Sequence, residues 1–207
     1  TNAIIDKVID NSRDYAGVII LTDKFKNEKD NTRNKIREKA LAAGFIAILN
    51  EGESKYHTKI DCGIENSLDY GRVILELYAL RGEQNGKNQR IYLTLGSKGS
   101  ICVDEDGKIH WSGVYRPDEK PKNTNGGGDS YAAGVCESEY QNHFVRDKDS
   151  QLSVQEIMQL ATATARARIN ENLTKEYINE LLSNDVLSYF KTEKTIEIIQ
   201  LFYDQNL

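Results

Sequence analysis

A glycine-rich segment ending in a carboxylate stands near the middle of the chain, where Gly126, Gly127, Gly128 and Asp129 lead into a stretch of small residues. Consecutive glycines let backbone N–H groups converge on one point, and the first turn of a helix adds unpaired N–H groups and the positive end of its dipole. Such a junction of loop and helix can bind a phosphate group through these N–H groups. Because an aspartate would repel that phosphate, we expect Asp129 to accept a proton from a nucleophile instead. The segment therefore indicates phosphoryl transfer, although taken alone it equally fits a flexible turn whose aspartate caps a helix.

The elements around this segment alternate between helical and strand patterns. Short apolar runs at residues 17–21, 45–49 and 91–95 predict strands buried on both faces. Helical patterns precede them at residues 4–9, across residues 30–42 up to a stop at Gly44, and at residues 68–80, with a polar connector at 82–89. Strands separated by helices imply right-handed crossovers. We therefore expect an α/β fold with a mainly parallel sheet flanked by helices.

The alternation of helical and strand patterns ends after Leu95. Residues 101–103 and 109–111, joined by the turn at 104–107, predict an antiparallel hairpin at the edge of the sheet. Ser153 and Glu156 form a capping-box pattern before a helix at residues 154–169. Further helices are expected at residues 175–182 and 195–203. The whole chain, residues 1–207, is expected to be one nucleotide-binding domain, with residues 175–207 as a helical tail packed on it.

Composition narrows the class of partner. The net charge of −5 is spread along the 207 residues, so no basic face for nucleic acid is expected. Cys62, Cys102 and Cys136 are widely spaced and odd in number, which fits neither a zinc site nor a disulfide framework. No apolar stretch approaches the roughly 20 residues that cross a bilayer. We expect a cytoplasmic protein with no membrane partner.

Four segments, in this order and spacing, resemble those of the PfkB/ribokinase-type sugar kinases. The most specific is Thr124-x-Gly126-Gly127-Gly128-Asp129, followed by small residues, which looks like that family's C-terminal signature. Residues 93–103 resemble its strand-turn-strand beside the nucleotide, and residues 50–53 are similar to its N-x-x-E element. Residues 153–169 occupy the place of its alanine-rich helix. The resemblance covers roughly residues 15–175 and implies a ribokinase-like fold.

The resemblance implies an ATP-dependent carbohydrate kinase that transfers the γ-phosphate to a hydroxyl of a sugar or nucleoside acceptor, with ATP and Mg²⁺ as cofactors. Asp129 would be the catalytic base, and the amides of the three preceding glycines would hold the transferring group. Nucleotide contacts would come from Thr94, Gly96, Gly99 and Thr124. Asn50 and Glu53 would approach Mg²⁺, usually through water.

Plainer interpretations stay open for two of these groups. Asn50 and Glu53 also fit a helix N-cap with a first-turn acid, and Thr94, Gly96 and Gly99 also fit an ordinary strand-turn signal. The spacing around Gly86 and Lys87 does not match a P-loop, and no G-x-G-x-x-G follows an early strand, so P-loop and Rossmann enzymes are disfavoured.

The chain also departs from the family pattern. Nothing in it resembles the N-terminal portion that carries most sugar contacts and a lid, so we expect the C-terminal part of a longer pattern. Asn123 stands where the family often has an aspartate, which puts a monovalent-cation site in doubt. The alternative function is a catalytically incomplete nucleotide-binding or regulatory module derived from such a kinase. The expected partner is the small-molecule acceptor. The chain could also pair with a second copy of itself as a homodimer, or with a missing N-terminal half.

Overall fold

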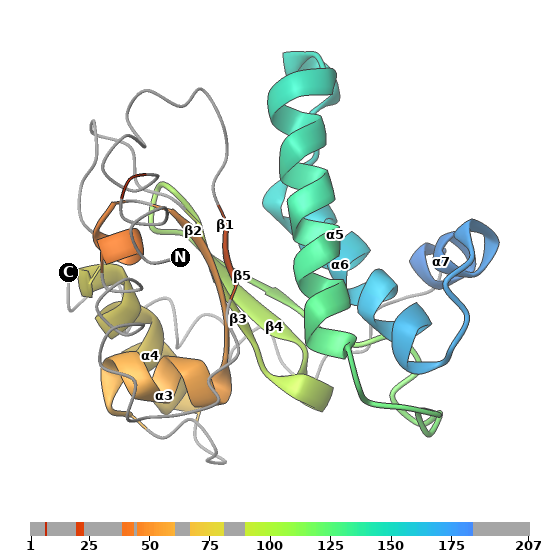
Figure 1. The fold of residues 1–207 in the computed structure, drawn as a ribbon, viewed down its shortest axis with the longest axis horizontal. Coiled ribbons are helices and arrows are strands. Elements are labelled where there is room, and N and C mark those ends of the chain that lie inside the picture. The colour runs from red at the N-terminus through yellow and green to blue at the C-terminus, as the bar shows by residue number, and fades with distance from the viewer. Residues whose placement is uncertain are drawn as a thin grey trace. The chain divides into compact units, whose positions relative to one another are not determined.

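The computed structural model describes residue 7 and residues 20–22, 39–43, 45–60, 67–80 and 90–183 (Figure 1). Four predictions fall wholly or mostly outside these residues: the helices at residues 4–9, 30–42 and 195–203 and the connector at 82–89. Residues 17–19 of the first predicted strand and Cys62 also lie outside them. The remaining predicted elements can be compared with the structure.

Five strands of the described chain form one sheet in the order β1-β2-β3-β4-β5, where the strands are β1 Ile20–Thr22, β2 Ile46–Asn50, β3 Ile91–Thr94, β4 Ser100–Val103 and β5 Ile109–Ser112. β1 and β2 pair in parallel, with Ile20 opposite Ile46 and Thr22 opposite Ile48. β4 and β5 follow each other through a tight turn, closed by a hydrogen bond from the Asp104 amide to the Lys108 carbonyl oxygen (3.0 Å). The predicted α/β arrangement with an edge hairpin is therefore present.

The apolar runs became strands because both faces are covered. Ile91, Tyr92 and Leu93 of β3 are all at most 1% exposed, as expected for a strand with no solvent face. β3 ends one residue before the predicted boundary, since Gly96 has a positive φ of 58° and opens the short 3₁₀ helix η2, Gly96–Lys98. β2 runs one residue further than predicted, because Asn50 keeps an extended backbone while capping the next helix.

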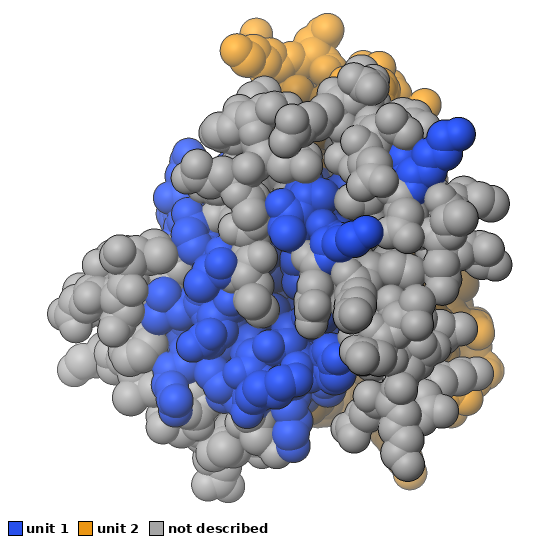
Figure 2. Space-filling model, turned by 60° about the vertical axis from the view of Figure 1, so that its left-hand side comes forward, with its two compact units in different colours: residues 1–93, 103–109, 197–207 blue, residues 94–102, 110–196 orange. Residues whose placement is uncertain are grey.

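The chain forms two compact units, which are coloured separately in Figure 2. The first comprises residues 1–93, 103–109 and 197–207. Its described helices include α3, Glu51–Thr58, and α4, Ser67–Leu80, which pack against each other (Figure 1). Val73, Ile74 and Leu77 of α4 are fully buried, so one face of this helix supplies the core of the unit.

The second unit comprises residues 94–102 and 110–196. In its described residues the helices are α5, Gly127–Tyr140, with the π-helical extension η3, Gln141–Val145, the short η4, Lys148–Ser150, then α6, Val154–Ile169, and α7, Lys175–Leu182. α5 and α6 lie side by side, and α7 packs on α6 (Figure 1). The predicted boundaries of α6 and α7 are confirmed. No helix in the described part of the chain is long and apolar enough to cross a membrane.

Candidate functional site

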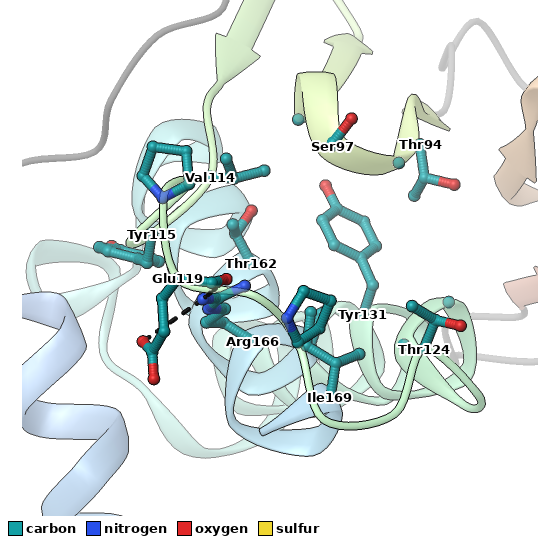
Figure 3. Close-up of a pocket in the computed structure, with 17 residues that line it drawn as sticks. Thr94, Ser97, Val114, Tyr115, Glu119, Thr124, Tyr131, Thr162, Arg166 and Ile169 are labelled. Atoms are coloured by element: carbon teal, nitrogen blue, oxygen red, sulfur yellow. Dashed lines mark hydrogen bonds and ion pairs between the residues drawn. The ribbon is translucent and has the colours of Figure 1, made fainter. Parts of the chain in front are cut away.

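A cavity of about 340 Å³ opens within the second unit (Figure 3). Its walls come from the turn between β3 and β4, the segment 113–121, the start of α5 and one face of α6. The lining residues are Thr94, Gly96, Ser97, Gly99, Val114, Tyr115, Pro117, Glu119, Pro121, Thr124, Gly127, Gly128, Tyr131, Thr162, Ala165, Arg166 and Ile169. All four predicted nucleotide contacts and two of the predicted catalytic glycines are among them, although these residues are up to 34 positions apart in the sequence.

The turn between β3 and β4 owes its shape to glycine. Gly99 has a φ of 103°, and a Cβ there would lie 2.0 Å from the carbonyl oxygen of Ser112 at the end of β5. Only glycine therefore allows the start of β4 to lie this close to β5. A hydrogen bond from the Leu95 amide to the Gly99 carbonyl oxygen (2.8 Å) closes the turn. Gly96, by contrast, has no atom within 4 Å of a would-be Cβ. Gly99 therefore has a structural role of its own, whereas the space at Gly96 is open.

The glycine segment starts α5 with unused amides. The Asn125 amide donates to the Asn123 side-chain oxygen (2.9 Å), and the Asn123 amide donates to the Ile169 carbonyl oxygen (2.9 Å), which fixes the approach to the helix. Gly126 caps α5 in the left-handed conformation (φ 80°) and has no side chain to cover the helix end. Among the described residues, no hydrogen bond uses the amide of Gly126, Gly127 or Gly128 as its donor. These amides, together with the dipole of a 14-residue helix, could donate hydrogen bonds to an anion, and this role stays a prediction.

The end of α6 borders the same segment. A Cβ on Gly126 would lie 3.1 Å from Arg168 Nε, and one on Gly127 would lie 3.0 Å from the Ile169 side chain. A Cβ on Gly128 would meet nothing within 4 Å. The first two glycines therefore leave room for α6, and Arg168 brings a positive charge beside the amides.

Asp129 lies in the first turn of α5, directly after the glycines, and is exposed. It is absent from the lining of the cavity, to which α5 contributes Gly127, Gly128 and Tyr131. Asp129 therefore stands at the start of α5 beside the glycine amides and outside the cavity lining. The role of Asp129 as a base stays a prediction.

Tyr131 is a cavity residue that the sequence did not point to. Its side chain extends from α5 towards the turn that carries Ser97, and its hydroxyl donates to Ser100 Oγ (2.9 Å) (Figure 3). Burial raises the pKa of Tyr131 well above its usual range, so the phenol stays neutral. Tyr131 therefore joins the start of α5 to β4 and gives the cavity a rigid wall.

Two buried polar residues of α6, Thr162 and Arg166, were also not identified from the sequence. They are four residues apart and thus on one helical face. The Arg166 guanidinium donates through Nη2 to the Glu119 backbone oxygen (2.6 Å) and carboxylate (3.3 Å) (Figure 3). Arg166 Nε and Thr162 Oγ1 are buried without a hydrogen-bond partner. The alternation of small and polar residues along 161–168 does not follow the helical period, so it could not reveal which arginine faces inwards.

The wall formed by residues 113–121 is anchored to α7. Tyr115 is buried with Ala163, Ala167 and Leu181. Arg116, whose positive φ of 48° turns the segment, forms an ion pair with Glu180 and lies 5.3 Å from the Tyr177 ring. The hydrogen bond with Glu180 raises the pKa of Arg116, so its charge is retained at any physiological pH. α7 thus holds the segment that carries Glu119.

Asn50 and Glu53 belong to the first unit and form a reciprocal capping box at the start of α3. The Glu53 amide donates to Asn50 Oδ1 (2.9 Å), and the Asn50 amide donates to Glu53 Oε2 (2.8 Å). The predicted helix-cap alternative is therefore present. Within the described ranges, no group of three or more His, Cys, Asp or Glu residues is arranged to hold a metal ion. Magnesium contact by this pair stays a prediction.

Comparison with known proteins gives one family. The sequence model described as pfkB family carbohydrate kinase matches residues 75–180, just over half of the chain. A comparison with curated protein sequences found no match.

Solved structures share the fold. Phosphofructokinase-2 from Escherichia coli, in complex with substrates and products, has a TM-score of 0.65 at 14% identity, over 88% of this chain and 52% of that one. Ribokinase from Arabidopsis thaliana, complexed with ribose and ATP, has a TM-score of 0.65 at 17% identity, over 89% and 54%. Aminoimidazole riboside kinase from Salmonella enterica, complexed with aminoimidazole riboside and an ATP analogue, has a TM-score of 0.65 at 14% identity, over 88% and 57%.

These likenesses confirm the predicted ribokinase-like fold. The chain spans about half the length of each of the three proteins.

Proposed function

Because the chain belongs to the pfkB family of carbohydrate kinases, we propose that it transfers the γ-phosphate of a nucleoside triphosphate to a hydroxyl of a sugar or sugar-like acceptor. ATP is the first donor to consider, since two of the similar structures contain ATP or an analogue of it. Membership of the family supports the class of reaction. The donor, the acceptor and the residue roles given below are part of the proposal.

One observation supports this function above the others. Six residues that the sequence predicted as nucleotide or phosphate contacts line a single cavity, namely Thr94, Gly96, Gly99, Thr124, Gly127 and Gly128. Its volume of about 340 Å³ lies within the range of ordinary small-molecule sites, roughly 300–1,000 Å³. The unused amides at the start of α5 fit a phosphate chain. The buried Thr162 and Arg166 of α6 add polar side chains to the lining of the same cavity.

In the proposed mechanism, Asp129 accepts the proton of the acceptor hydroxyl as that oxygen attacks phosphorus. The nucleotide supplies the phosphoryl group. The amides of Gly126, Gly127 and Gly128 donate hydrogen bonds to the oxygens over which negative charge spreads. The helix dipole favours the same charge. A positioned base contributes about 10²–10⁴ in rate, and one anion-hole donor about 10²–10³.

Asn50 and Glu53 are the proposed contacts of Mg²⁺. Their capping box holds both side chains in fixed orientations at the carboxyl end of β2, which is the end of a strand where ligands of open α/β sheets bind. Mg²⁺ usually keeps several of its waters, so a carboxylate can act through one of them. When bound, the metal would neutralise phosphate charge.

A second function is supported by the position of Asp129. Because this carboxylate is exposed and does not line the cavity, a chain that binds a nucleotide without transferring phosphate is the alternative. Such a module would have regulatory rather than catalytic use.

Acceptor-dependent release of nucleoside diphosphate tests the two functions. The protein is incubated with Mg²⁺ and ATP, GTP or ITP, together with a panel of hexoses, pentoses, sugar phosphates and nucleosides. The kinase predicts diphosphate release that depends on one class of acceptor. Triphosphate binding without turnover on any acceptor would favour the module, and a failure to bind any triphosphate would contradict both.

A further inference from the structure

The cavity of the second unit is lined by two structures that lie apart in the sequence. The turn between β3 and β4 supplies predicted nucleotide contacts, and the start of α5 supplies Gly127 and Gly128. A ligand that uses both sets of contacts needs a fixed distance between them. Tyr131 extends from α5 towards this turn (Figure 3), and its hydroxyl donates a hydrogen bond to Ser100 Oγ (2.9 Å). This hydrogen bond therefore joins the two structures.

Both partners of the hydrogen bond are buried. Tyr131 is 4% exposed and Ser100 is 1% exposed. Because burial raises the pKa of Tyr131, the phenol keeps its proton and acts as the donor at any physiological pH. With so little exposure, the loss of one hydroxyl leaves the other buried without its partner. The two side chains therefore act as a pair.

On the β4 side, Ser100 is firmly attached to the turn. It directly follows Gly99, whose carbonyl oxygen accepts a hydrogen bond from the Leu95 amide (2.8 Å). The Lys98 amide in turn donates to the Leu95 carbonyl oxygen (3.1 Å). Gly99 also packs directly against the backbone of β5, as its missing Cβ would lie 2.0 Å from the Ser112 carbonyl oxygen. Holding Ser100 Oγ therefore holds the whole turn.

On the α5 side, Tyr131 follows the glycine segment by about one helical turn. Gly127 and Gly128 lie four and three positions earlier and so share its helical face, and all three residues line the cavity. A tyrosine side chain has only two rotatable side-chain torsions, so a ring anchored at its hydroxyl has little freedom. Tyr131 therefore holds the start of the helix at a set distance from β4.

We propose that Tyr131 is a positioning residue of the proposed kinase, because its hydroxyl, through Ser100, fixes the spacing between the β3–β4 turn and the amides of Gly127 and Gly128. A nucleotide held by the turn then presents its phosphates to these amides. This inference rests on the proposed function, since it concerns the same site and the same reaction. Without the hydrogen bond, the nucleotide still binds the turn, but the amides meet the transferring group less well. Those amides act on charge that develops in the transition state, so transfer should suffer more than binding.

Tyr131→Phe removes the hydroxyl and keeps the ring. We expect kcat for acceptor-dependent diphosphate release to fall at least about tenfold, since a misplacement of about 1 Å can cost about 10²-fold. The KM for ATP should rise less than about threefold, because the contacts with the turn remain. Tyr177→Phe is the matched control, because the Tyr177 hydroxyl also takes part in a 2.9 Å hydrogen bond, from Asn170 Nδ2, and lies outside the cavity lining. It should keep both kcat and KM within about threefold of the wild type.

Ser100→Ala, alone and combined with Tyr131→Phe, separates positioning from stability. Each single variant leaves one buried hydroxyl without its partner and should unfold at a lower urea concentration than the wild type. The double variant removes both hydroxyls and should regain most of this loss of stability. Its kcat should nevertheless stay low, because the hydrogen bond is still missing. A kcat that recovers together with stability would leave the bond a structural role only and overturn the proposal.

The other outcomes separate this inference from the proposed function. Wild-type kcat in a folded Tyr131→Phe variant would overturn the positioning role while leaving the kinase intact. A raised KM for ATP with an unchanged kcat would also overturn it, because the hydroxyl would then act on binding alone. If the wild-type chain transfers phosphate to no acceptor, the proposed function fails and the inference fails with it.

Discussion

The side chains of Asn50 and Glu53 cap helix α3 in the structure and are also the proposed contacts of Mg²⁺. The two hydrogen bonds of their capping box satisfy the start of α3, and Glu53 is only 6% exposed. A glutamine can make the same reciprocal bond without the charge. This substitution therefore separates the cap from the metal contact.

For Glu53→Gln we predict an unfolding free energy within about 0.5 kcal/mol of the wild type. The Mg²⁺ concentration needed for half-maximal phosphoryl transfer should rise severalfold, because the metal loses a nearby negative charge. The measurement is a Mg²⁺ titration of activity beside urea unfolding. Glu51→Gln, which removes an equal charge from the same helical turn, is the control, and equal Mg²⁺ requirements in all three proteins would contradict the metal role.

Gly126 is the glycine of the loop whose backbone demands that residue. Its φ of 80° is left-handed, and a Cβ there would lie 3.1 Å from Arg168 Nε. Gly126→Ala should therefore lower the unfolding free energy by about 1–2 kcal/mol. Gly128→Ala should cause no loss, since nothing lies within 4 Å of its Cβ position and its φ is not in the left-handed region. Urea unfolding of the two variants checks this, and equal losses would show that the loop differs from the described geometry.

The close packing of α5 against α6 is the main helix contact of the second unit. Gly134 lies where α5 comes close to α6, because a Cβ there would lie only 2.7 Å from the Ala161 Cα. Both residues are buried. Because the neighbouring atom belongs to a helix backbone, it cannot rotate away as a side chain would.

Gly134→Ala should lower the unfolding free energy by about 1–3 kcal/mol, the usual cost of overpacking. Helix propensity alone predicts the opposite sign, since alanine stabilises a helix interior by about 1 kcal/mol over glycine. Thermal or urea unfolding distinguishes the two, and a gain in stability would mean that the helices are further apart than described.

The cap of α6 carries a pH-dependent contribution. The Ser153 side-chain hydrogen bond is the main cause that lowers the pKa of Glu156, and the Ser153 amide adds to it (2.7 Å). A carboxyl with a lowered folded-state pKa stabilises the protein above its unfolded pKa, and this contribution is lost as the pH falls through the folded pKa.

Ser153→Ala should therefore cost about 1 kcal/mol at neutral pH, the usual value of a lost N-cap. The difference from the wild type should shrink from about pH 5 downwards, as Glu156 becomes protonated. Urea unfolding at pH 7 and at about pH 4 measures both terms. A difference that grows on acidification would contradict the assigned hydrogen bond.

Elements with strong end signals were predictable from the sequence. α6 begins at the Ser153–Glu156 capping box and α7 after Thr174, whose hydroxyl accepts from the Tyr177 amide (3.2 Å), and both match their predicted ranges. Strand ends shifted by one residue, because the left-handed Gly96 and the capping Asn50 act on the backbone in ways that apolar periodicity does not encode.

The candidate site was predictable from the sequence where residue type alone determines the chemistry. The glycine segment, Thr94 and Gly96 could be placed together because loops at strand ends and helix starts meet. Tyr131, Thr162 and Arg166 could not, since their inclusion depends on which helical face turns inwards, and Glu119 required a contact 47 residues away. The prediction of one domain with a helical tail stays a prediction.

The candidate site residues are distributed over both units. The second unit carries the cavity, the unused amides and Asp129, whereas Asn50 and Glu53 lie in the first. A chain that spans about half the length of similar kinases thus contains the proposed phosphate site.

Asp129→Asn separates phosphate transfer from nucleotide binding, because only transfer needs the proposed base. With the best acceptor from the panel, we predict that acceptor-dependent diphosphate release falls by about 10²–10⁴, the contribution of a positioned base. Nucleotide affinity should stay within about threefold, because Asp129 does not line the cavity. Transfer at the wild-type rate in Asp129→Asn would contradict the account.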